Sequence, residues 1–210
     1  MHVLVNPAVK DVLDTGRPKG GLFMVFPNFM KNQVTDVSPR FWRIQAVTLK
    51  LKTATLLLIN TYFPTDNLRQ NEDHEDLQET LGHINNIIEN TEFTSVLWGG
   101  DLNADFLRNT SHTRSVQDSV TDLSLTRAWD RFPIDFTRCQ DRLGVTYTST
   151  LDHFFWSENV EEAGVIHHPD NKSDHSPIYC VIDNDRAELH RSHGVTTSTI
   201  LAASNSSKSR

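Results

Sequence analysis

A long apolar run, TATLLLINTYF at residues 53–63, constrains the fold of this chain more than any other segment. The run is mostly apolar and contains β-branched residues, as do strands that are covered on both faces. The run stops at Pro64, which cannot donate a hydrogen bond to a neighbouring strand. The segment therefore predicts a strand with other structure packed on both of its faces.

Strand-like and helix-like segments alternate along the rest of the chain. Apolar residues recur at spacings of three and four between residues 77 and 88, which predicts a helix with one buried face. A second helix or irregular segment is expected at about residues 111–125. Further strand-like runs lie at residues 20–26, 41–51, 95–100, 144–157, 162–168 and 176–183. Strands with helices outside them predict the α/β class, as a layered α/β sandwich.

The composition fits one globular domain with a tail. Of the 210 residues, 37% are hydrophobic and 22% are charged. We expect a folded domain over residues 1–185 and a disordered tail over residues 186–210, because the tail is rich in serine and threonine. Reduced thiols are the expected state of Cys139 and Cys180, although a disulfide between them stays open.

No apolar run approaches the roughly 18 residues that a membrane-spanning helix needs. Residues 1–10 lack the basic start, apolar stretch and cleavage site of a secretory signal. We therefore expect an intracellular protein, nuclear or cytoplasmic, that is not secreted and does not associate with a membrane.

Charge is distributed unevenly along the chain, whose formal net charge is −7. Residues 1–60 hold eight basic and three acidic residues, a balance of +5. Residues 66–92 hold eight acidic residues and Arg69, a balance of −7, which indicates the solvated face of a helix. A protein that binds nucleic acid needs a basic surface, but that surface can be local. The net charge therefore neither supports nor excludes a nuclease.

Polar residues that could carry chemistry follow the apolar run at 95–100. Asp101 and Asn103 stand two residues apart, and strand residues with this spacing point to the same face. A carboxylate beside a carboxamide can activate a water molecule and hold a phosphoryl oxygen. The alternative is an Asx-turn at the end of a strand, because both residue types favour turns.

Three further residues could join such a site. Asp152 lies inside an apolar strand-like run, where a carboxylate is costly unless it is paired. His175, in the sequence SDHS, is a plausible partner that a carboxylate would hold protonated. Tyr62 lies at a strand end, where ligands of α/β folds tend to bind. The alternatives are a solvated strand face for Asp152, a surface turn for His175 and ordinary packing for Tyr62.

Taken together and in order, four motifs resemble the signature series of the endonuclease/exonuclease/phosphatase family, which includes apurinic/apyrimidinic endonucleases and pancreatic deoxyribonuclease. The motifs are NTYFP at 60–64, GDLNA at 100–104, STLDH at 149–153 and SDHSP at 173–177. GRPKGGL at 16–22 and TYTSTLDHFFWS at 146–157 are also similar to the endonuclease domains of LINE-type retrotransposons. The resemblance covers about residues 15–183 and implies a deoxyribonuclease-like sandwich.

The resemblance also implies roles for these residues. Asp101 matches the general base or water-orienting acid, and Asn103 matches the partner that steadies the attacked phosphate. His175 matches the histidine that contacts the scissile phosphate, and Asp152 matches the acid that orients it. Tyr62 matches a phenol near the phosphate or the leaving group. Asn103, Tyr62 and His175 are thus the expected substrate-binding residues.

A metal and a substrate follow from the same resemblance. Asp101 and Asp174 are the expected metal ligands, and hard oxygen ligands of this kind suit Mg²⁺, with Mn²⁺ as an alternative. The implied reaction is in-line attack by water on a phosphodiester of DNA. No protein partner is inferred.

The sequence departs from the family pattern at its start. That pattern opens with a strand carrying an Asn, a helix, and a second strand that ends in a metal-binding Glu. Here fifteen residues precede Gly16, and the first glutamate is Glu72. Residues 78–80, QET, look like the absent motif, but they lie on a predicted helix downstream of the NTYFP motif. We therefore expect the first strand-helix-strand segment to be missing and the activity to be impaired.

Three function classes stay open. The first is a DNA-nicking endonuclease of a non-LTR retrotransposon, in which a reverse transcriptase often accompanies the endonuclease. The second is a phosphatase or lipid phosphodiesterase of the same superfamily, which a comparison of DNA with an inositol phosphate as substrate would separate. The third is a catalytically dead remnant that binds nucleic acid or nothing, and salt-dependent DNA binding without turnover would favour it.

Overall fold

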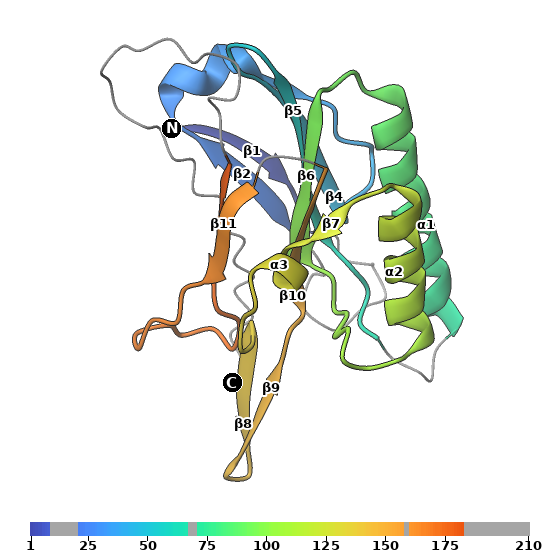
Figure 1. Ribbon diagram of the computed structural model, residues 1–210, viewed down its shortest axis with the longest axis vertical. Coiled ribbons are helices and arrows are strands. Elements are labelled where there is room, and N and C mark those ends of the chain that lie inside the picture. Colours follow the sequence, from blue (N-terminus) through green and yellow to red (C-terminus); the bar gives the residue numbers. More distant parts are fainter. Residues whose placement is uncertain (9–20, 67–70, 158–159, 183–210) are drawn as a thin grey trace.

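The computed structural model describes residues 1–8, 21–66, 71–157 and 160–182 (Figure 1). Its centre is a six-stranded mixed sheet in which β5 and β6 are parallel and every other neighbouring pair is antiparallel. In sheet order its strands are β3 (Val34–Asp36), β4 (Ile44–Lys50), β5 (Thr55–Tyr62), β6 (Ser95–Asp101), β10 (Asp152–Trp156) and β7 (Thr126–Arg127). The expected tail at 186–210 lies outside the described residues, as does most of the segment 16–22.

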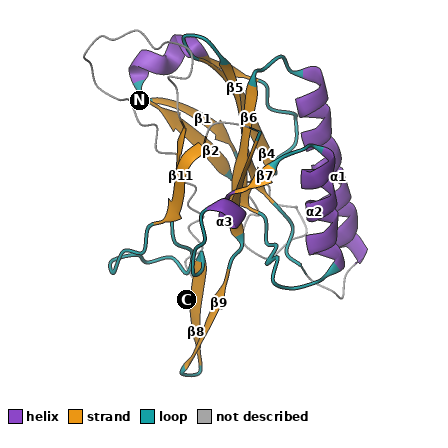
Figure 2. Cartoon of the chain, in the orientation of Figure 1, coloured by secondary structure: helices purple, strands orange, loops and turns teal. Residues whose placement is uncertain are grey.

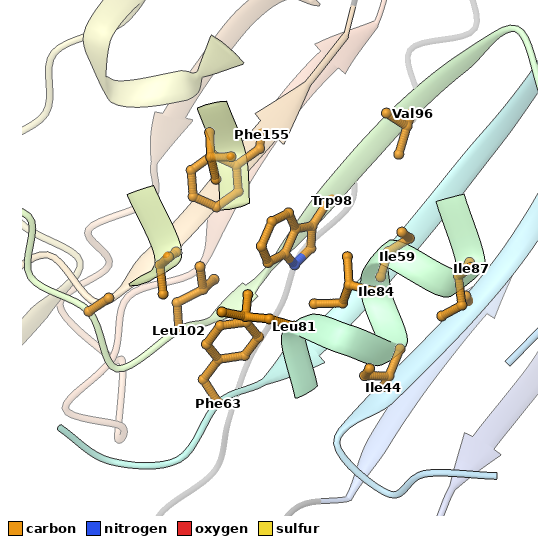
Figure 3. Close-up of a cluster of buried hydrophobic side chains, with 14 of the residues drawn as sticks. Ile44, Ile59, Phe63, Leu81, Ile84, Ile87, Val96, Trp98, Leu102 and Phe155 are labelled. Atoms are coloured by element: carbon orange, nitrogen blue, oxygen red, sulfur yellow. The ribbon is translucent and has the colours of Figure 1, made fainter. Parts of the chain in front are cut away.

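Two helices cover one face of this sheet, α1 (Asn71–Asn90) and α2 (Ser111–Asp122) (Figure 2). The predicted apolar stripe of α1 packs on the sheet, whereas Glu75, Glu79 and Glu89 face solvent. Aliphatic side chains, together with Phe63 and Phe155, fill the space between helices and sheet around Trp98, which is fully buried (Figure 3). The amphipathic pattern of α1 therefore forms the first layer of the sandwich, as predicted.

Two hairpins cover the opposite face of the sheet. The first joins β1 (His2–Asn6) to β2 (Leu22–Phe26), and the second joins β11 (Val160–Val165) to β12 (Ile178–Ile182). Their inward residues form a second core with the sheet residues Leu58 and Leu97. Since β5 is packed on both faces, the interpretation of residues 53–63 is confirmed, and so is the layered α/β architecture.

The predicted run at 144–157 forms two strands instead of one. Residues Val145–Ser149 form β9, which pairs with β8 (Arg138–Arg142) in a hairpin that projects from the body of the molecule (Figure 1). The chain leaves this hairpin at Leu151, where the Thr137 hydroxyl accepts hydrogen bonds from the backbone N–H groups of Leu151 and Asp152. This contact ends one strand and starts β10 in the main sheet.

The remaining elements are short, namely the 3-10 helix at Asn28–Gln33 and α3 (Ala128–Arg131). Both Cys139 and Cys180 are free thiols, as expected. Burial raises the pKa of the Cys180 thiol to about 12. Of the helices that the structure describes, none combines the length and the apolar character needed to cross a membrane.

Candidate active site

Three neighbouring strands bring the predicted polar residues to one edge of the main sheet. Tyr62 ends β5, Asp101 ends β6 and Asp152 begins β10. The strand register places Asp101 directly beside both Tyr62 and Asp152. Asp101 is 5% exposed and Asp152 is 3% exposed. Carboxylates buried this deeply need charged or hydrogen-bonding partners.

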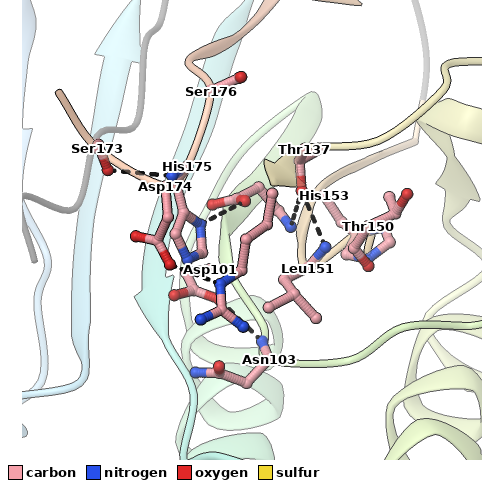
Figure 4. Close-up of polar contacts among 12 residues, drawn as sticks. Asp101, Asn103, Thr137, Thr150, Leu151, His153, Ser173, Asp174, His175 and Ser176 are labelled. Atoms are coloured by element: carbon pink, nitrogen blue, oxygen red, sulfur yellow. Dashed lines mark hydrogen bonds and ion pairs between the residues drawn. The ribbon is translucent and has the colours of Figure 1, made fainter. Parts of the chain in front are cut away.

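His175 is the partner of Asp152, as the sequence predicted. It lies in the segment that leads into β12, and its backbone forms an isolated bridge with Arg138. The Nδ1 atom of His175 donates a hydrogen bond to Oδ2 of Asp152 over 2.8 Å. Because a carboxylate only accepts, this contact places a proton on Nδ1 and fixes the orientation of the ring. Figure 4 shows the ring of His175 close to Asp101 and Asp174.

The surroundings of His175 favour its protonated form. Burial by itself lowers the pKa of the imidazole. The hydrogen bond and the charge of Asp152, together with the charges of Asp101 and Asp174, outweigh burial and raise the pKa above its ordinary value. These surroundings therefore favour a protonated imidazole beside Asp101, Asp152 and Asp174, and a protonated imidazole is suited to contact a phosphate oxygen.

Asn103 reaches the site through a turn, which corrects the expectation that it shares a strand face with Asp101. Strand β6 ends at Asp101, and Asn103 has a φ of 48°, in the left-handed region that Asn tolerates. Its backbone N–H donates to Oδ1 of Asp101 over 3.0 Å. Its side-chain Nδ2 donates to the carbonyl of Phe63 over 3.0 Å. The Asx-turn considered as the alternative is thus itself part of the site.

Asp174 forms an ion pair at the same edge. Nε of Arg138 lies 2.8 Å from Oδ2 of Asp174. Arg138 also donates to Oε1 of Gln140 over 3.1 Å. Arg138 stands in β8, outside the four motifs, so the sequence pattern did not point to it. Its pairing with His175 across the isolated bridge brings it to the site.

One group of donors could hold a cation. Single ligand atoms of Asp101, Asp152 and His175 all lie within 4.8 Å of one another. The two carboxylates fit a hard ion such as Mg²⁺, although Oδ2 of Asp152 already accepts from His175. Of the two predicted metal ligands, Asp101 belongs to this group, whereas Asp174 lies against Arg138. Within the described residues, no glutamate belongs to the group.

Tyr62 is half-buried next to Asp101 and Arg43. Burial and the charge of Asp101 raise the pKa of its phenol, and the charge of Arg43 lowers it, with a net rise. The phenol is therefore protonated at neutral pH and can donate a hydrogen bond. Arg43, which also lies outside the four motifs, is 5% exposed and pairs with Asp76 over 2.8 Å.

Comparisons with solved structures agree with this fold. The endonuclease domain of TRAS1, a telomere-specific non-LTR retrotransposon, is 17% identical with a TM-score of 0.63, over 86% of this chain and 80% of that one. An endonuclease/exonuclease/phosphatase family protein from Leptotrichia buccalis is 16% identical with a TM-score of 0.61, over 87% and 71%. A 3' phosphatase from Neisseria bound to a product DNA hairpin is 16% identical with a TM-score of 0.54, over 67% and 65%.

Sequence comparison identifies the family directly. No curated protein sequence matches the chain. The family described as endonuclease-reverse transcriptase matches residues 56–179, which is more than half of the 210 residues and contains Asp101, Asp152 and His175. The four motifs, the mixed sheet between two layers and this match lead to one conclusion. The chain belongs to the endonuclease-reverse transcriptase family, within the endonuclease/exonuclease/phosphatase fold.

Proposed function

We propose that this protein is a metal-dependent phosphodiester hydrolase that nicks DNA, like the endonuclease of a non-LTR retrotransposon. The observation that carries the proposal is the group formed by Asp101, Asp152 and His175 at the ends of adjacent strands. Family membership and the DNA-processing enzymes among the similar structures support the choice of DNA.

In this proposal each residue of the site has a separate role in hydrolysis. Asp101 accepts a proton from the attacking water, and Asn103 steadies the phosphate. The imidazolium of His175, oriented by Asp152, donates a hydrogen bond to a phosphate oxygen as negative charge develops there. Water adds to phosphorus, the bond to the leaving oxygen breaks, and that oxygen takes up a proton. Tyr62 lies on the side of Asp101 opposite to Asp152, where its phenol can contact the phosphate or the leaving group.

Asp101 and Asp174 are the proposed ligands of Mg²⁺, with Mn²⁺ as a substitute. When bound, the ion would offset the negative charge that develops on the phosphate. Oδ2 of Asp174 pairs with Nε of Arg138, so a bound ion would share this carboxylate with the guanidinium. Of the described acids at the site, Asp152 already accepts from His175 and Asp174 already pairs with Arg138, so we expect the chain to turn over slowly.

The test of this function is the nicking of supercoiled plasmid by the purified chain in Mg²⁺, with Asp101→Ala as the inactive control. We expect slow nicking that EDTA abolishes and that the variant lacks. An inositol phosphate serves as the competing substrate. Hydrolysis of that compound without nicking would favour a phosphatase or lipid phosphodiesterase. DNA binding without any turnover would identify a catalytically dead protein.

A further inference from the structure

The turn that carries Asp101 and Asn103 is held by two buried histidines outside the group of proposed ligands. Nε2 of His112 lies 3.0 Å from the carbonyl oxygen of Leu102. Nε2 of His153 lies 2.8 Å from the carbonyl oxygen of Ala104. Because carbonyl oxygens only accept, both Nε2 atoms carry the proton. These two carbonyls flank Asn103, the residue with left-handed backbone.

The two histidines reach the turn from different elements. His112 lies in the first turn of α2, which a reciprocal capping box at Thr110 and Thr113 fixes in place. His153 follows Asp152 in β10, so its side chain points to the opposite face of the sheet. His112 is 5% exposed and His153 is 1% exposed. The turn is therefore tied to a helix on one side and to a strand on the other.

Ring contacts hold each imidazole in its orientation. His153 meets Phe106 edge to face at 4.7 Å and stacks on Phe155 at 6.0 Å. The ring of His112 meets Phe63 edge to face at 6.4 Å. Phe63 is also the residue whose carbonyl accepts from the Asn103 side chain. A shift of either imidazole would thus be transmitted to the residue between them.

We propose that His112 and His153 are positioning residues that fix the turn aiming Asp101 and Asn103 at the substrate. The inference rests on the function proposed above and adds to it two residues that do not touch the reacting atoms. Without these donors, two buried carbonyls would lose their hydrogen bonds, and the turn would relax toward other conformations. A displacement of about 1 Å in a catalytic group can lower a rate by roughly 100-fold.

The test compares His153→Phe with His153→Gln, and His112→Phe with His112→Gln. Phenylalanine keeps a flat ring but removes the donor, whereas the glutamine amide restores a donor near the position of Nε2. The exposed His74 supplies the matched controls His74→Phe and His74→Gln. Circular dichroism selects variants that fold, and single-turnover nicking in Mg²⁺ is measured together with the DNA dissociation constant.

For both phenylalanine variants of the buried histidines, we expect the single-turnover rate to fall roughly 10- to 100-fold while DNA affinity changes less than about threefold. Both glutamine variants should recover most of the rate, and the His74 variants should match the unchanged protein. A folded His153→Phe variant that nicks at the unchanged rate would overturn the role of His153, and the same holds for His112.

A second readout does not depend on activity. The side-chain amide of Asn103 gives a pair of signals in a ¹H–¹⁵N spectrum, whose positions report its bond to Phe63. We expect these signals to move in each phenylalanine variant and to return in each glutamine variant. If the unchanged protein nicks no DNA, the proposed function fails and these signals alone decide. Signals that stay in place in both phenylalanine variants would then refute the positioning role.

Discussion

At the scale of single residues, the pair of Asp152 and His175 sets the electrostatics of the site. The carboxylate contributes both a hydrogen bond and a charge to the raised pKa of the imidazole. Asp174 makes the smallest of the contributions that raise it. Asp152 and Asp174 therefore raise the pKa of His175 to different extents, which a titration of His175 can distinguish.

We predict that Asp152→Asn lowers the pKa of His175 and that Asp174→Asn lowers it less. Without the Asp152 carboxylate, burial favours the neutral imidazole and is opposed only by the weaker attraction of Asp101 and Asp174. As the pH rises, the Asp152→Asn variant should therefore lose activity at a lower pH than the unchanged protein does. An NMR titration of the His175 ring protons measures both shifts. An unchanged pKa in Asp152→Asn would contradict the assignment of cause.

His153 has the opposite electrostatic character. Burial lowers its pKa to about 4, although hydrogen bonds to Ala104 and Thr150 and the charge of Asp152 act against the shift. Between its ordinary pKa of 6.5 and about 4, the unfolded chain binds a proton that the folded protein does not. The stabilising contribution of the neutral ring is thus present above pH 6.5 and is lost as the pH falls through this window.

We predict that His153→Gln makes the protein less sensitive to acid. Near pH 4 the unchanged protein should have lost on the order of 3 kcal/mol through this group, which glutamine cannot lose. Urea unfolding at pH 7 and at pH 4.5 measures the difference between the two proteins. An identical loss of stability in both would show that His153 is not the source of acid sensitivity.

At the scale of elements, the close approach of β5 and β6 depends on a glycine. Gly100 has a φ of 141°, and a Cβ atom there would lie 2.0 Å from the carbonyl oxygen of Thr61 on the neighbouring strand. Both the backbone conformation and the space exclude a side chain at the residue that precedes Asp101. By contrast, a Cβ atom added to Gly82, in the middle of α1, would have no atom within 4 Å apart from its chain neighbours and the backbone of its own helix.

We predict that Gly100→Ala destabilises the protein by about 3 kcal/mol or more, through clash and backbone strain. The matched change Gly82→Ala should stabilise it by about 0.5–1 kcal/mol, because alanine is the better helix former. Thermal unfolding of both variants measures the contrast. Equal stabilities would mean that β5 and β6 do not approach as closely as the structure shows.

Elements with a strong periodic pattern were predictable, and elements made by long-range contacts were not. The apolar runs of β5 and β6 and the stripe of α1 identified these elements directly. Strand β8 was missed because RCQDR has no apolar pattern and forms only by pairing with β9. Its two-residue turn has positive φ at both Leu143 and Gly144, without the Asn-Gly or Asp-Gly sequence that usually signals such a turn.

The same distinction, between what the sequence pattern predicts and what long-range contacts create, applies to the candidate site. Asp101, Asp152 and His175 were found because their motifs interrupt apolar strands with groups that need partners. The Asx-turn at Asn103 was open as an alternative in the sequence, but the hydrogen bond from its side chain to Phe63, forty positions away, is not revealed by spacing along the chain. The pairing of Arg138 with Asp174 depends on a hairpin that the sequence pattern did not show.

At the scale of the whole molecule, the layers explain why the site lies where it does. The helical layer and the two hairpins bury both faces of the sheet, and the polar residues gather where strands β5, β6 and β10 meet at one edge. The exposed acidic residues of α1 lie on the outer side of the helical layer. Part of the negative net charge therefore lies on a surface that faces away from the sheet.

The most direct test is to locate a bound cation by titration with Mn²⁺, whose unpaired electrons broaden nearby NMR signals. We predict that the signals of Asp101, Asp174 and the neighbouring His175 broaden first and that Mg²⁺ in excess restores them. In Asp101→Asn, this selective broadening should disappear while the fold is kept. Broadening that begins elsewhere in the protein, or that survives in Asp101→Asn, would contradict the claim that these residues form one cation-binding catalytic site.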